Sequence, residues 1–387
     1  MIVGVLGAGA MGSGIAQVAA TAGHSVLLRD INEAAAQKGI ESVRKSLGGQ
    51  VAKQKLTQER ADEILGRIGN GSAEAASLSE CGLVIEAIVE DLDVKQRTFR
   101  EIETTVSPEC ILATNTSSLS VTAIADACAR PERVIGIHFF NPAAVLPLVE
   151  IVPGKLTSPE ITKRSRALID SWGKTTVIAS DTPGFIVNRI ARPFYGEAIR
   201  IYEEGMADSA TIDWAMKEIG GFRMGPFELM DFIGNDINLA ATTAVYEGTN
   251  RDPRYKPSLT QQRLVEAGKL GMKSGRGHYD YSDGAEKPEP TKNEALGKRI
   301  ADRIIAMLVN EAADAAVLGI GTPADIDLAM TKGVNYPKGL LQWGNEIGLD
   351  NVANAIETLR AESGGDERYR VSPLLKEMAA HGKSFHQ

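Results

Sequence analysis

The fold of this chain is decided near its start by the stretch Ile2-Val3-Gly4-Val5-Leu6-Gly7-Ala8-Gly9-Ala10-Met11-Gly12. A short apolar run leads directly into a GxGxxG pattern, and a helix-like stretch at residues 13–22 follows. In this order of strand, turn and helix, Gly7 permits the tight turn, Gly9 lets the backbone approach a pyrophosphate, and Gly12 lets the helix pack closely on the strand. The stretch therefore predicts a dinucleotide site at the helix N-terminus, formed by Gly7, Ala8, Gly9, Ala10, Met11 and Gly12.

An acidic residue at the end of the next apolar run supports this hypothesis, because the glycine pattern alone also occurs in purely structural turns. The run Ser25-Val26-Leu27-Leu28-Arg29 predicts a second strand, and Asp30 follows it, 18 residues beyond Gly12. A carboxylate at about this distance accepts hydrogen bonds from the ribose hydroxyls and repels a 2′-phosphate. We therefore expect NAD, rather than NADP, as the cofactor.

The other strand candidates alternate with helix-like stretches along the first part of the chain. Apolar, partly β-branched runs predict strands at residues 83–87, 111–114, 134–139, 148–152 and 175–179. This alternation is typical of a largely parallel, doubly wound sheet, so we expect an α/β Rossmann domain over residues 1–180. Within it, residues 39–63 are rich in Lys, Gln, Glu and Ala and predict an inserted helical hairpin.

Length and composition exclude several other classes of protein. The 387 residues allow two or three domains, and 43% hydrophobic with 24% charged residues are typical of a folded chain. The net charge of -8 is spread without long runs of one sign, so we expect no nucleic-acid partner. The first basic residue is Arg29, and the apolar start is short and interrupted by glycines. We therefore expect a cytoplasmic protein without a membrane segment.

The cysteines and histidines carry no pattern of their own. Cys81, Cys110 and Cys128 lack CxxC spacing, so we expect buried, reduced thiols. The five histidines lie far apart without HExxH or paired Cys/His spacing, so we expect no metal site.

Polar residues end three of the apolar runs, at the sheet edge where ligands bind in this type of fold. They are Asn115-Thr116-Ser117-Ser118, His138 and Glu150. His138 alone would more often be a structural histidine, whereas a lone buried carboxylate at Glu150 would carry a large desolvation cost. Since Pro142 and Pro147 break the intervening segment, a turn could bring Glu150 to one ring nitrogen of His138 and leave the other nitrogen as a base. A base facing a nicotinamide is what oxidation of a secondary alcohol requires.

With these residues the sequence resembles the L-3-hydroxyacyl-CoA dehydrogenase family, which includes 3-hydroxybutyryl-CoA dehydrogenase. The resemblance covers residues 2 to about 281 and lies in the motifs GAGAMGSGIAQVAA, EAIVEDLDVK, NTSSL, GIHFFNPA, DTPGFIVNR, GPFEL and GMKSGRGHYDY. It implies the reversible NAD-dependent oxidation of an (S)-3-hydroxyacyl-CoA to the 3-oxoacyl-CoA, a reaction of fatty acid metabolism and β-oxidation. The acyl-CoA substrate rests on this resemblance alone, since the residue chemistry reaches only a hydride-transferring alcohol dehydrogenase.

Two other functions compete with this interpretation. A β-hydroxyacid dehydrogenase would act on a free carboxylate, usually with a catalytic lysine in the helical domain, and the pair of His138 and Glu150 argues against it. A non-enzymatic NAD-binding protein that kept the fold would have a damaged site. Every position taken over from the family holds the expected residue type, which argues against this alternative as well.

The resemblance also implies roles for the reactive residues. It makes His138 the catalytic base and Glu150 its partner. It makes Ser117 and Asn188 the groups that hold the reacting oxygen of the substrate and the neighbouring carbonyl. Without the resemblance, Asn188 would be interpreted as a capping or surface residue, because it follows the turn-like segment Pro183-Gly184-Phe185.

The cofactor and coenzyme A contacts implied by the resemblance are spread along the chain. Three residues match positions that contact the nicotinamide half of NAD, and a fourth matches a lysine that reaches the cofactor from the second domain: Glu90, Lys95, Asn141 and Lys273. Ser46 and Lys53 lie at about the place where the family contacts coenzyme A. From the residues alone, Glu90 and Lys95 could form a surface charge pair, and Lys53 could be a solvated helix lysine.

From Asp181 onward the chain is predicted to be helical, with helix-like stretches at residues 185–204 and 209–218. A shift of 114 residues aligns residues 189–236 with residues 303–350, and 14 of the 48 aligned positions are identical. This is an internal repeat, joined by a linker at residues 282–293. We therefore expect the Rossmann domain to be followed by two tandem all-α domains of the family's C-terminal type, at residues 181–283 and 293–387.

The second copy departs from the site expected in the first. It lacks the Asp-Thr-Pro-Gly-Phe segment, and Asp302 stands where Asn188 stands in the first copy, so we expect no catalytic role for it. Short members of the family pair their single helical copy with that of a partner chain, and the tandem form resembles the multifunctional fatty acid oxidation proteins. We therefore expect residues 293–387 to pack on the first copy, in a monomer with an internal pseudo-dimer or in a homodimer.

Overall fold

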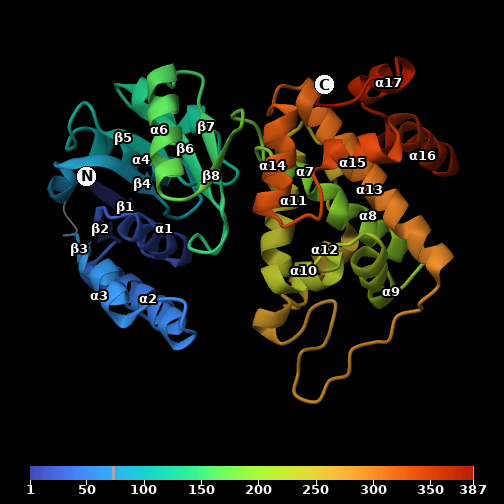
Figure 1. The fold of residues 1–387 in the computed structure, drawn as a ribbon, viewed down its shortest axis with the longest axis horizontal. Coiled ribbons are helices and arrows are strands. Elements are labelled where there is room, and N and C mark those ends of the chain that lie inside the picture. Colours follow the sequence, from blue (N-terminus) through green and yellow to red (C-terminus); the bar gives the residue numbers. More distant parts are fainter. Residues whose placement is uncertain (72–74, 387) are drawn as a thin grey trace. The chain divides into compact units, whose positions relative to one another are not determined.

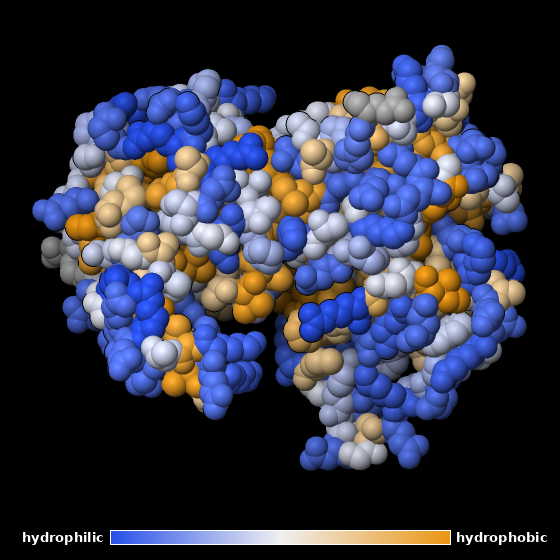
Figure 2. All heavy atoms as spheres, in the orientation of Figure 1, coloured by the Kyte–Doolittle hydropathy of each residue, from blue (hydrophilic) through white to orange (hydrophobic). Residues whose placement is uncertain are grey.

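In the computed structural model, which describes residues 1–71 and 75–386, the chain divides into two units (Figure 1). Unit 1 comprises Met1–Asp181 and unit 2 comprises Thr182–Gln387. The division lies next to residues 180 and 181, where the sequence changes from strand-rich to helical patterns. No helix of the described residues is long and apolar enough to cross a membrane, and hydrophilic side chains cover much of the face drawn in Figure 2.

Unit 1 is organised by one eight-stranded sheet with the order β3-β2-β1-β4-β5-β6-β7-β8. Its strands are β1 Ile2–Leu6, β2 Ser25–Arg29, β3 Ile68–Asn70, β4 Cys81–Glu86, β5 Ile111–Thr114, β6 Val134–Phe139, β7 Leu148–Pro153 and β8 Thr175–Ile178. All neighbouring strands are parallel except β6 and β7, which run antiparallel. The order changes direction between β1 and β4, and in such a doubly wound sheet this switch point opens a crevice for a ligand. The predicted doubly wound sheet is therefore confirmed.

The β-branched and leucine-rich strands of unit 1 bury side chains on both faces of the sheet, because helices cover both faces. In β1, Val3 and Val5 belong to one hydrophobic cluster, and Leu6 belongs to another. The first cluster also takes residues from α1 Ala10–Thr21, α2 Glu33–Ala52, α3 Gln58–Gly66 and α6 Pro159–Ser171. The second takes residues from α4 Leu92–Glu103, α5 Val121–Ala125 and the 3₁₀ turn η1 Ala75–Leu78, and a further 3₁₀ turn is η2 Pro131–Arg133.

Two features of unit 1 bear on the sequence-based expectations. The hairpin expected within residues 39–63 is present as α2 and α3, which pack on each other. Strand β3 was not expected. Only Ile68 of its three residues is buried, so the short segment carries no strand-like alternation.

Unit 2 is built from helices (Figure 1). The first part contains α7 Val187–Ile190, α8 Arg192–Glu203, α9 Ser209–Trp214, the π-helical segment η3 Ala215–Ile219, α10 Pro226–Ile233, α11 Asn235–Gly248, η4 Pro253–Tyr255, α12 Leu259–Glu266 and η5 Met272–Ser274. The second part contains α13 Glu294–Val317, α14 Pro323–Gly333, α15 Leu340–Ile347, α16 Leu349–Glu362, η6 Glu367–Tyr369 and α17 Pro373–Ala380. The helix expected over residues 185–204 is split into α7 and α8, because Pro193 has no N–H for a helical hydrogen bond and must lie in the first turn.

The two parts of unit 2 repeat each other at the offset of 114 residues seen in the sequence. The bounds of α10, α11, η4 and α12 coincide at that offset with those of α15, α16, η6 and α17. The repeat therefore extends beyond the residues that the sequence comparison aligned. A local contact repeats as well: Asp213 accepts hydrogen bonds from the backbone N–H groups of Phe227 and Glu228, and Asp327 accepts them from the N–H groups of Leu341 and Gln342.

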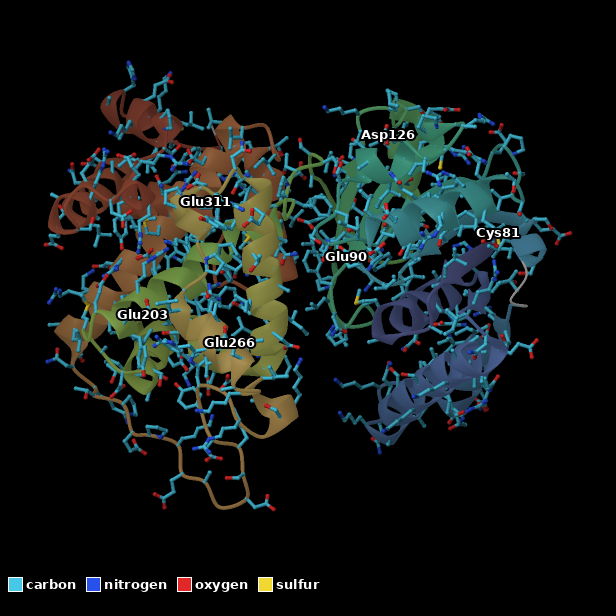
Figure 3. The ribbon with its side chains drawn as sticks, turned by 180° about the vertical axis from the view of Figure 1, so that it is seen from behind. Cys81, Glu90, Asp126, Glu203, Glu266 and Glu311 are labelled. Atoms are coloured by element: carbon cyan, nitrogen blue, oxygen red, sulfur yellow. The ribbon has the colours of Figure 1, made fainter. Side chains whose placement is uncertain are left out.

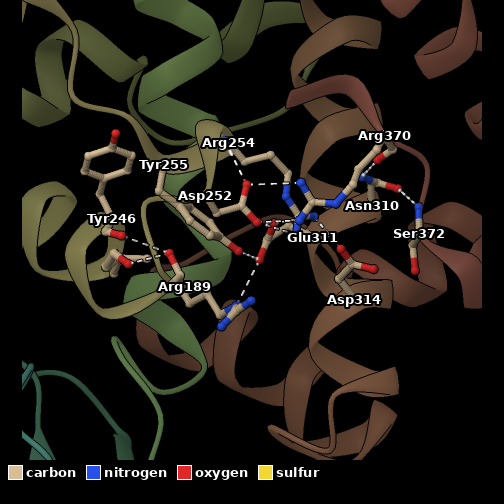
Figure 4. Close-up of polar contacts among 12 residues, drawn as sticks. Arg189, Tyr246, Asp252, Arg254, Tyr255, Asn310, Glu311, Asp314, Arg370 and Ser372 are labelled. Atoms are coloured by element: carbon tan, nitrogen blue, oxygen red, sulfur yellow. Dashed lines mark hydrogen bonds and ion pairs between the residues drawn. The ribbon is translucent and has the colours of Figure 1, made fainter. Parts of the chain in front are cut away.

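Helices α7 and α8 pack against α13, and an equivalent arginine–glutamate pair crosses this interface in each direction. The Nε of Arg189 donates to Glu311 at 3.1 Å, and the Nε of Arg303, its counterpart at the offset of 114, donates to Glu197 at 3.1 Å. Each carboxylate also accepts a hydrogen bond from a tyrosine hydroxyl, Glu311 from Tyr255 (Figure 4) and Glu197 from Tyr369. A contact that is reciprocated in this way is the signature of an isologous interface.

Candidate active site

The glycine-rich loop between β1 and α1 has the geometry that its sequence predicts. Gly7 has a φ of 94°, and a Cβ atom there would lie 2.4 Å from the carbonyl oxygen of Ala87. A Cβ atom at Gly12 would lie 1.7 Å from the carbonyl oxygen of Gly7. At Gly9, by contrast, a Cβ atom would meet no described atom within 4 Å, so the backbone is open to a ligand. Gly9 also caps α1, whose first turn carries the exposed Ala10 and the half-buried Met11.

Asp30 lies directly after β2 and is tied to this loop. Its Oδ2 accepts a hydrogen bond from the backbone N–H of Ala8 at 2.6 Å, and its Oδ1 accepts one from the N–H of Ile31 at 2.7 Å. The carboxylate is half-buried, so one side remains accessible. An open glycine loop, a helix N-terminus and a carboxylate fixed beside them fit the pyrophosphate and a ribose of NAD.

His138 and Glu150 face each other across the antiparallel pair β6 and β7. They are direct register partners, and the distance between His138 Nδ1 and Glu150 Oε2 is 2.7 Å. Both side chains are buried, at 5% and 0% exposure. Because the carboxylate accepts from Nδ1, the neutral ring carries its proton there and its lone pair on Nε2. The predicted contact between the two residues is therefore confirmed.

The loop after β5 is held in place by Glu90. One oxygen of Glu90, Oε1, accepts hydrogen bonds from the hydroxyl of Thr116 at 2.6 Å, the N–H of Ser117 at 3.0 Å and the N–H of Ser118 at 3.1 Å. Burial raises the pKa of the Glu90 carboxyl, but the nearby Lys95 ammonium and these hydrogen bonds outweigh it and hold the pKa below its usual value. Ser117 is half-buried, and its hydroxyl makes no hydrogen bond to the residues that the structure describes.

Lys95 lies behind Glu90 rather than at the surface. Its side chain is 1% exposed, and its Nζ lies 2.5 Å from Glu86 Oε1 and 3.2 Å from Glu90 Oε2. The other oxygen of Glu86 accepts a hydrogen bond from the Thr114 hydroxyl at 2.8 Å. The pairing of Glu90 with Lys95 is real, but only Glu90 is exposed, whereas Lys95 is buried and is shared with the buried Glu86.

Glu86 was missed as a site residue in the sequence. It ends the apolar run Leu83-Val84-Ile85 in the same way as the polar residues that were singled out after other strands. The same rule would have found it. Asn115 also has a defined role, since its Oδ1 accepts a hydrogen bond from the backbone N–H of Phe139 at 2.8 Å, next to His138.

The remaining predicted site residues are distributed over both units. In unit 1, Asn141 is exposed just after β6, Ser46 is exposed on α2, and Lys53 is exposed at the C-terminal end of α2. In unit 2, Asn188 is half-buried on α7, and Lys273 on η5 forms an ion pair with Asp236 at 2.6 Å. The structure thus brings together His138 with Glu150 and Glu90 with Ser117, while the roles given to the other residues stay predictions.

Comparisons with known proteins point to one family. The model of the 3-hydroxyacyl-CoA dehydrogenase NAD binding domain matches residues 2–182, and that of the 3-hydroxyacyl-CoA dehydrogenase C-terminal domain matches residues 184–281 and 300–385.

Individual relatives agree with the family models. The chain is 38% identical to 3-hydroxyadipyl-CoA dehydrogenase of Escherichia coli (strain K12), with 97% of each chain covered. It is 43% identical to 3-hydroxybutyryl-CoA dehydrogenase of Bradyrhizobium diazoefficiens, covering 75% of this chain and 98% of that protein. The crystal structure of 3-hydroxybutyryl-CoA dehydrogenase from Escherichia coli K12 superimposes with a TM-score of 0.91 at 36% identity, covering 98% of both chains.

Proposed function

Because this chain belongs to the 3-hydroxyacyl-CoA dehydrogenase family, it is an NAD-dependent oxidoreductase acting on the CH–OH group of 3-hydroxyacyl-CoA, and we propose that His138 and Glu150 carry the proton transfer. The reaction interconverts an (S)-3-hydroxyacyl-CoA, such as 3-hydroxybutyryl-CoA, and the 3-oxoacyl-CoA. The observation that carries the proposal is the buried contact of 2.7 Å between His138 Nδ1 and Glu150 Oε2. It leaves the lone pair of Nε2 to accept the proton of the substrate hydroxyl.

In the direction of oxidation, Nε2 of His138 takes the proton from the 3-hydroxyl group. NAD, when bound at the glycine loop, supplies the acceptor for the hydride that leaves the same carbon. The imidazolium that forms is stabilised by the Glu150 carboxylate, and this stabilisation is strong because neither side chain is solvated. In the direction of reduction, Nε2 returns the proton to the oxygen.

The loop after β5 is proposed to position the substrate oxygen. We assign this contact to the Ser117 hydroxyl, supported by the fixed backbone of Ser117 on Glu90 and by the free donor capacity of its side chain within the described residues. Asn188 is proposed to hold the neighbouring carbonyl. Lys95 is proposed to act mainly by fixing Glu90, since its Nζ is bound to two carboxylates.

We also propose the remaining cofactor contacts and the coenzyme A contacts. Glu90 and Asn141 are proposed for the nicotinamide half of NAD, and Lys273 for a cofactor contact from unit 2. Ser46 and Lys53 are proposed for coenzyme A, supported by their exposure on and beside α2. The alternative of a dehydrogenase for free β-hydroxyacids lacks comparable support. The family match favours the thioester substrate, and the histidine–glutamate pair stands in place of the catalytic lysine expected of such an enzyme.

A direct assay tests the proposed function. The purified protein is mixed with NADH and acetoacetyl-CoA, and the loss of NADH absorbance is followed. Turnover of acetoacetyl-CoA, with none of a free 3-oxoacid, is the expected result. Turnover of the free acid alone would overturn the assignment.

We further propose that residues 181–283 and 293–387 are two copies of one helical domain and that the second copy has a structural role. The proposal is supported by the coinciding bounds of four elements and by the reciprocal pairs Arg189–Glu311 and Arg303–Glu197. The second copy would then cover the face of the first copy that a shorter relative buries against a partner subunit. Truncation near Asp283 should give an insoluble or newly oligomeric protein in size-exclusion chromatography, and a well-behaved active monomer would contradict the proposal.

A reducing compartment such as the cytoplasm is proposed as the location. All three cysteines are free and buried. Burial raises the pKa of the Cys81 thiol to about 11 and those of Cys110 and Cys128 to about 12, so none of them is poised to react.

A further inference from the structure

A cavity of about 190 Å³ lies in unit 2 between α8, α11, η4 and the start of α12. None of the residues that line it has been given a catalytic or ligand-binding role above. Its wall carries five cationic side chains, Arg192, Arg200, Arg254, Lys256 and Arg368. The one acidic side chain in the wall is Glu203, at the end of α8 (Figure 3), and its Oε1 already accepts a hydrogen bond from the hydroxyl of Thr260 at 2.6 Å.

Three of these cations are neutralised by carboxylates behind the wall. The ion pairs are Arg200–Glu197, Arg254–Asp314 and Arg368–Asp366. Arg192 and Lys256 form no ion pair with the described residues of the chain. Lys256 is exposed and can be balanced by solvent, whereas Arg192 is only 6% exposed. The cavity wall therefore holds one buried positive charge without a counter-charge.

Every acceptor that Arg192 contacts is a neutral oxygen. Its Nε donates to the backbone oxygen of Asn188 at 2.7 Å, and its Nη1 donates to the hydroxyl of Thr242 at 3.1 Å and, at 3.4 Å, to the backbone oxygen of Asn238. Its Nη2 makes no hydrogen bond to the described residues. Burial lowers the pKa of this guanidinium, because the charged form is poorly solvated. A buried charge of this kind is costly to the fold unless a ligand supplies the opposite charge.

The repeat within unit 2 shows that the helical fold does not need this polar group. At the offset of 114 residues, four polar positions of the first copy have aliphatic counterparts in the second: Arg192 has Ala306, Asn238 has Val352, Thr242 has Ile356 and Gln261 has Leu375. All four aliphatic side chains are buried. The same helices thus pack around an apolar cluster in one copy and around a charged one in the other. A function specific to the first copy explains the difference.

We propose that this cavity binds an oxyanion group, a carboxylate or a phosphate, through Arg192 and Lys256. Arg254 offers a further donor, since its Nε is buried and has no hydrogen-bond partner among the described residues. The group could belong to the far end of a dicarboxylic acyl chain, because Arg192 is bonded to the backbone of Asn188, a residue assigned to the substrate. It could also be a free anion that binds independently of the substrate. Both sources present the same chemistry to Arg192.

The binding test uses inorganic phosphate and adipate as probes, with NADH bound so that the glycine loop is occupied. Calorimetric titration should show saturable binding, and both anions should raise Tm. Arg192→Met should weaken the affinity about tenfold or more, and Lys256→Glu should weaken it severalfold. Lys332→Glu makes the same charge change at an exposed residue outside the cavity and should leave the affinity unchanged.

The outcome of this titration decides the proposal. The proposal would be overturned if neither phosphate nor adipate bound saturably, or if all variants bound them with equal affinity. If Arg192→Met does not fold, Lys256→Glu still decides, because an exposed side chain can be replaced without disturbing the core.

A kinetic arm then separates the two sources, and this arm alone rests on the proposed function. The values of kcat/KM for 3-hydroxyadipyl-CoA and 3-hydroxybutyryl-CoA are compared in wild type and both cavity variants. A loss of about tenfold for the dicarboxylic substrate alone supports the acyl-chain source. Unchanged kinetics with a loss of anion affinity support the free anion. If neither thioester turned over, the proposed function would fail while the binding result stood by itself.

Discussion

Removal of the charge of Glu311 is the sharpest test of how unit 2 is held together. The substitution Glu311→Gln keeps the shape of a side chain that is 1% exposed. Glu311 accepts from Arg189 Nε at 3.1 Å and lies 3.2 Å from Arg254 Nη1. Arg254 keeps Asp314 as a partner, but Arg189 has no other ion pair among the described residues. The variant therefore leaves a buried guanidinium without its counter-charge.

The size of the effect follows from this loss. Removing one partner of a buried ion pair costs about 3–5 kcal/mol, and the low end applies here because the glutamine oxygen can still accept the hydrogen bond of Tyr255. For a unit of this size, each kcal/mol lowers Tm by about 2–4 °C, so a fall of about 6–12 °C is expected. Glu197 is the counterpart of Glu311 at the offset of 114 residues. The substitution Glu197→Gln removes the ion-pair partner of Arg200 and should lower Tm by a similar amount.

Differential scanning calorimetry of the full chain measures both variants. Glu346→Gln is the matched control, because Glu346 pairs with Lys338 on the exposed side of α15 and should leave Tm unchanged. The reasoning would be refuted by a Tm of Glu311→Gln within about 2 °C of wild type. It would also be refuted if one of the two equivalent variants were strongly destabilised and the other were not.

Four further variants test the site in unit 1. Glu150→Gln should lower kcat about 10²–10³-fold, because a neutral amide cannot stabilise the imidazolium, while the Kd of NADH stays the same; an unchanged kcat in the acetoacetyl-CoA assay would contradict this. Gly9→Val should weaken NADH binding about tenfold or more with little change in Tm, since a Cβ atom at position 9 meets no described atom within 4 Å. Gly12→Val, by contrast, should fail to fold. In fluorescence titrations, Asp30→Asn should raise the Kd of NADH severalfold and reduce the preference for NADH over NADPH. An unchanged preference would show that Asp30 does not belong to the ribose site.

The architecture of unit 1 could be predicted because local patterns set it. Strands that are buried on both faces appear as apolar runs, so β5 and β6 have the bounds that the sequence predicted. Strand β3 was not predicted, because only one of its three residues is buried. It is stabilised by its pairing with β2, which its own composition does not indicate. The break between α7 and α8 depends on Pro193. It was not predicted, because a proline is as compatible with the first turn of a helix as with the end of one.

The site shows the same division between local and non-local information. The contact of His138 with Glu150 could be predicted because one short connection, broken by prolines, brings two neighbouring strands together. The buried position of Lys95 on α4 could not be predicted, because it depends on the contact with Glu86 at the end of β4. The cluster around Arg192 is formed by residues far apart on α8, α11 and α12, and only the packed helices bring them to one cavity.

The central claim is that His138 is the base of an NAD-dependent 3-hydroxyacyl-CoA dehydrogenase. The most direct test is the kcat of His138→Gln for the reduction of acetoacetyl-CoA by NADH, with the Kd of NADH measured in the same preparation. We predict a fall in kcat of about 10²–10⁴-fold, with NADH affinity nearly unchanged. A variant as active as wild type would contradict the assignment of His138 and the mechanism built on it.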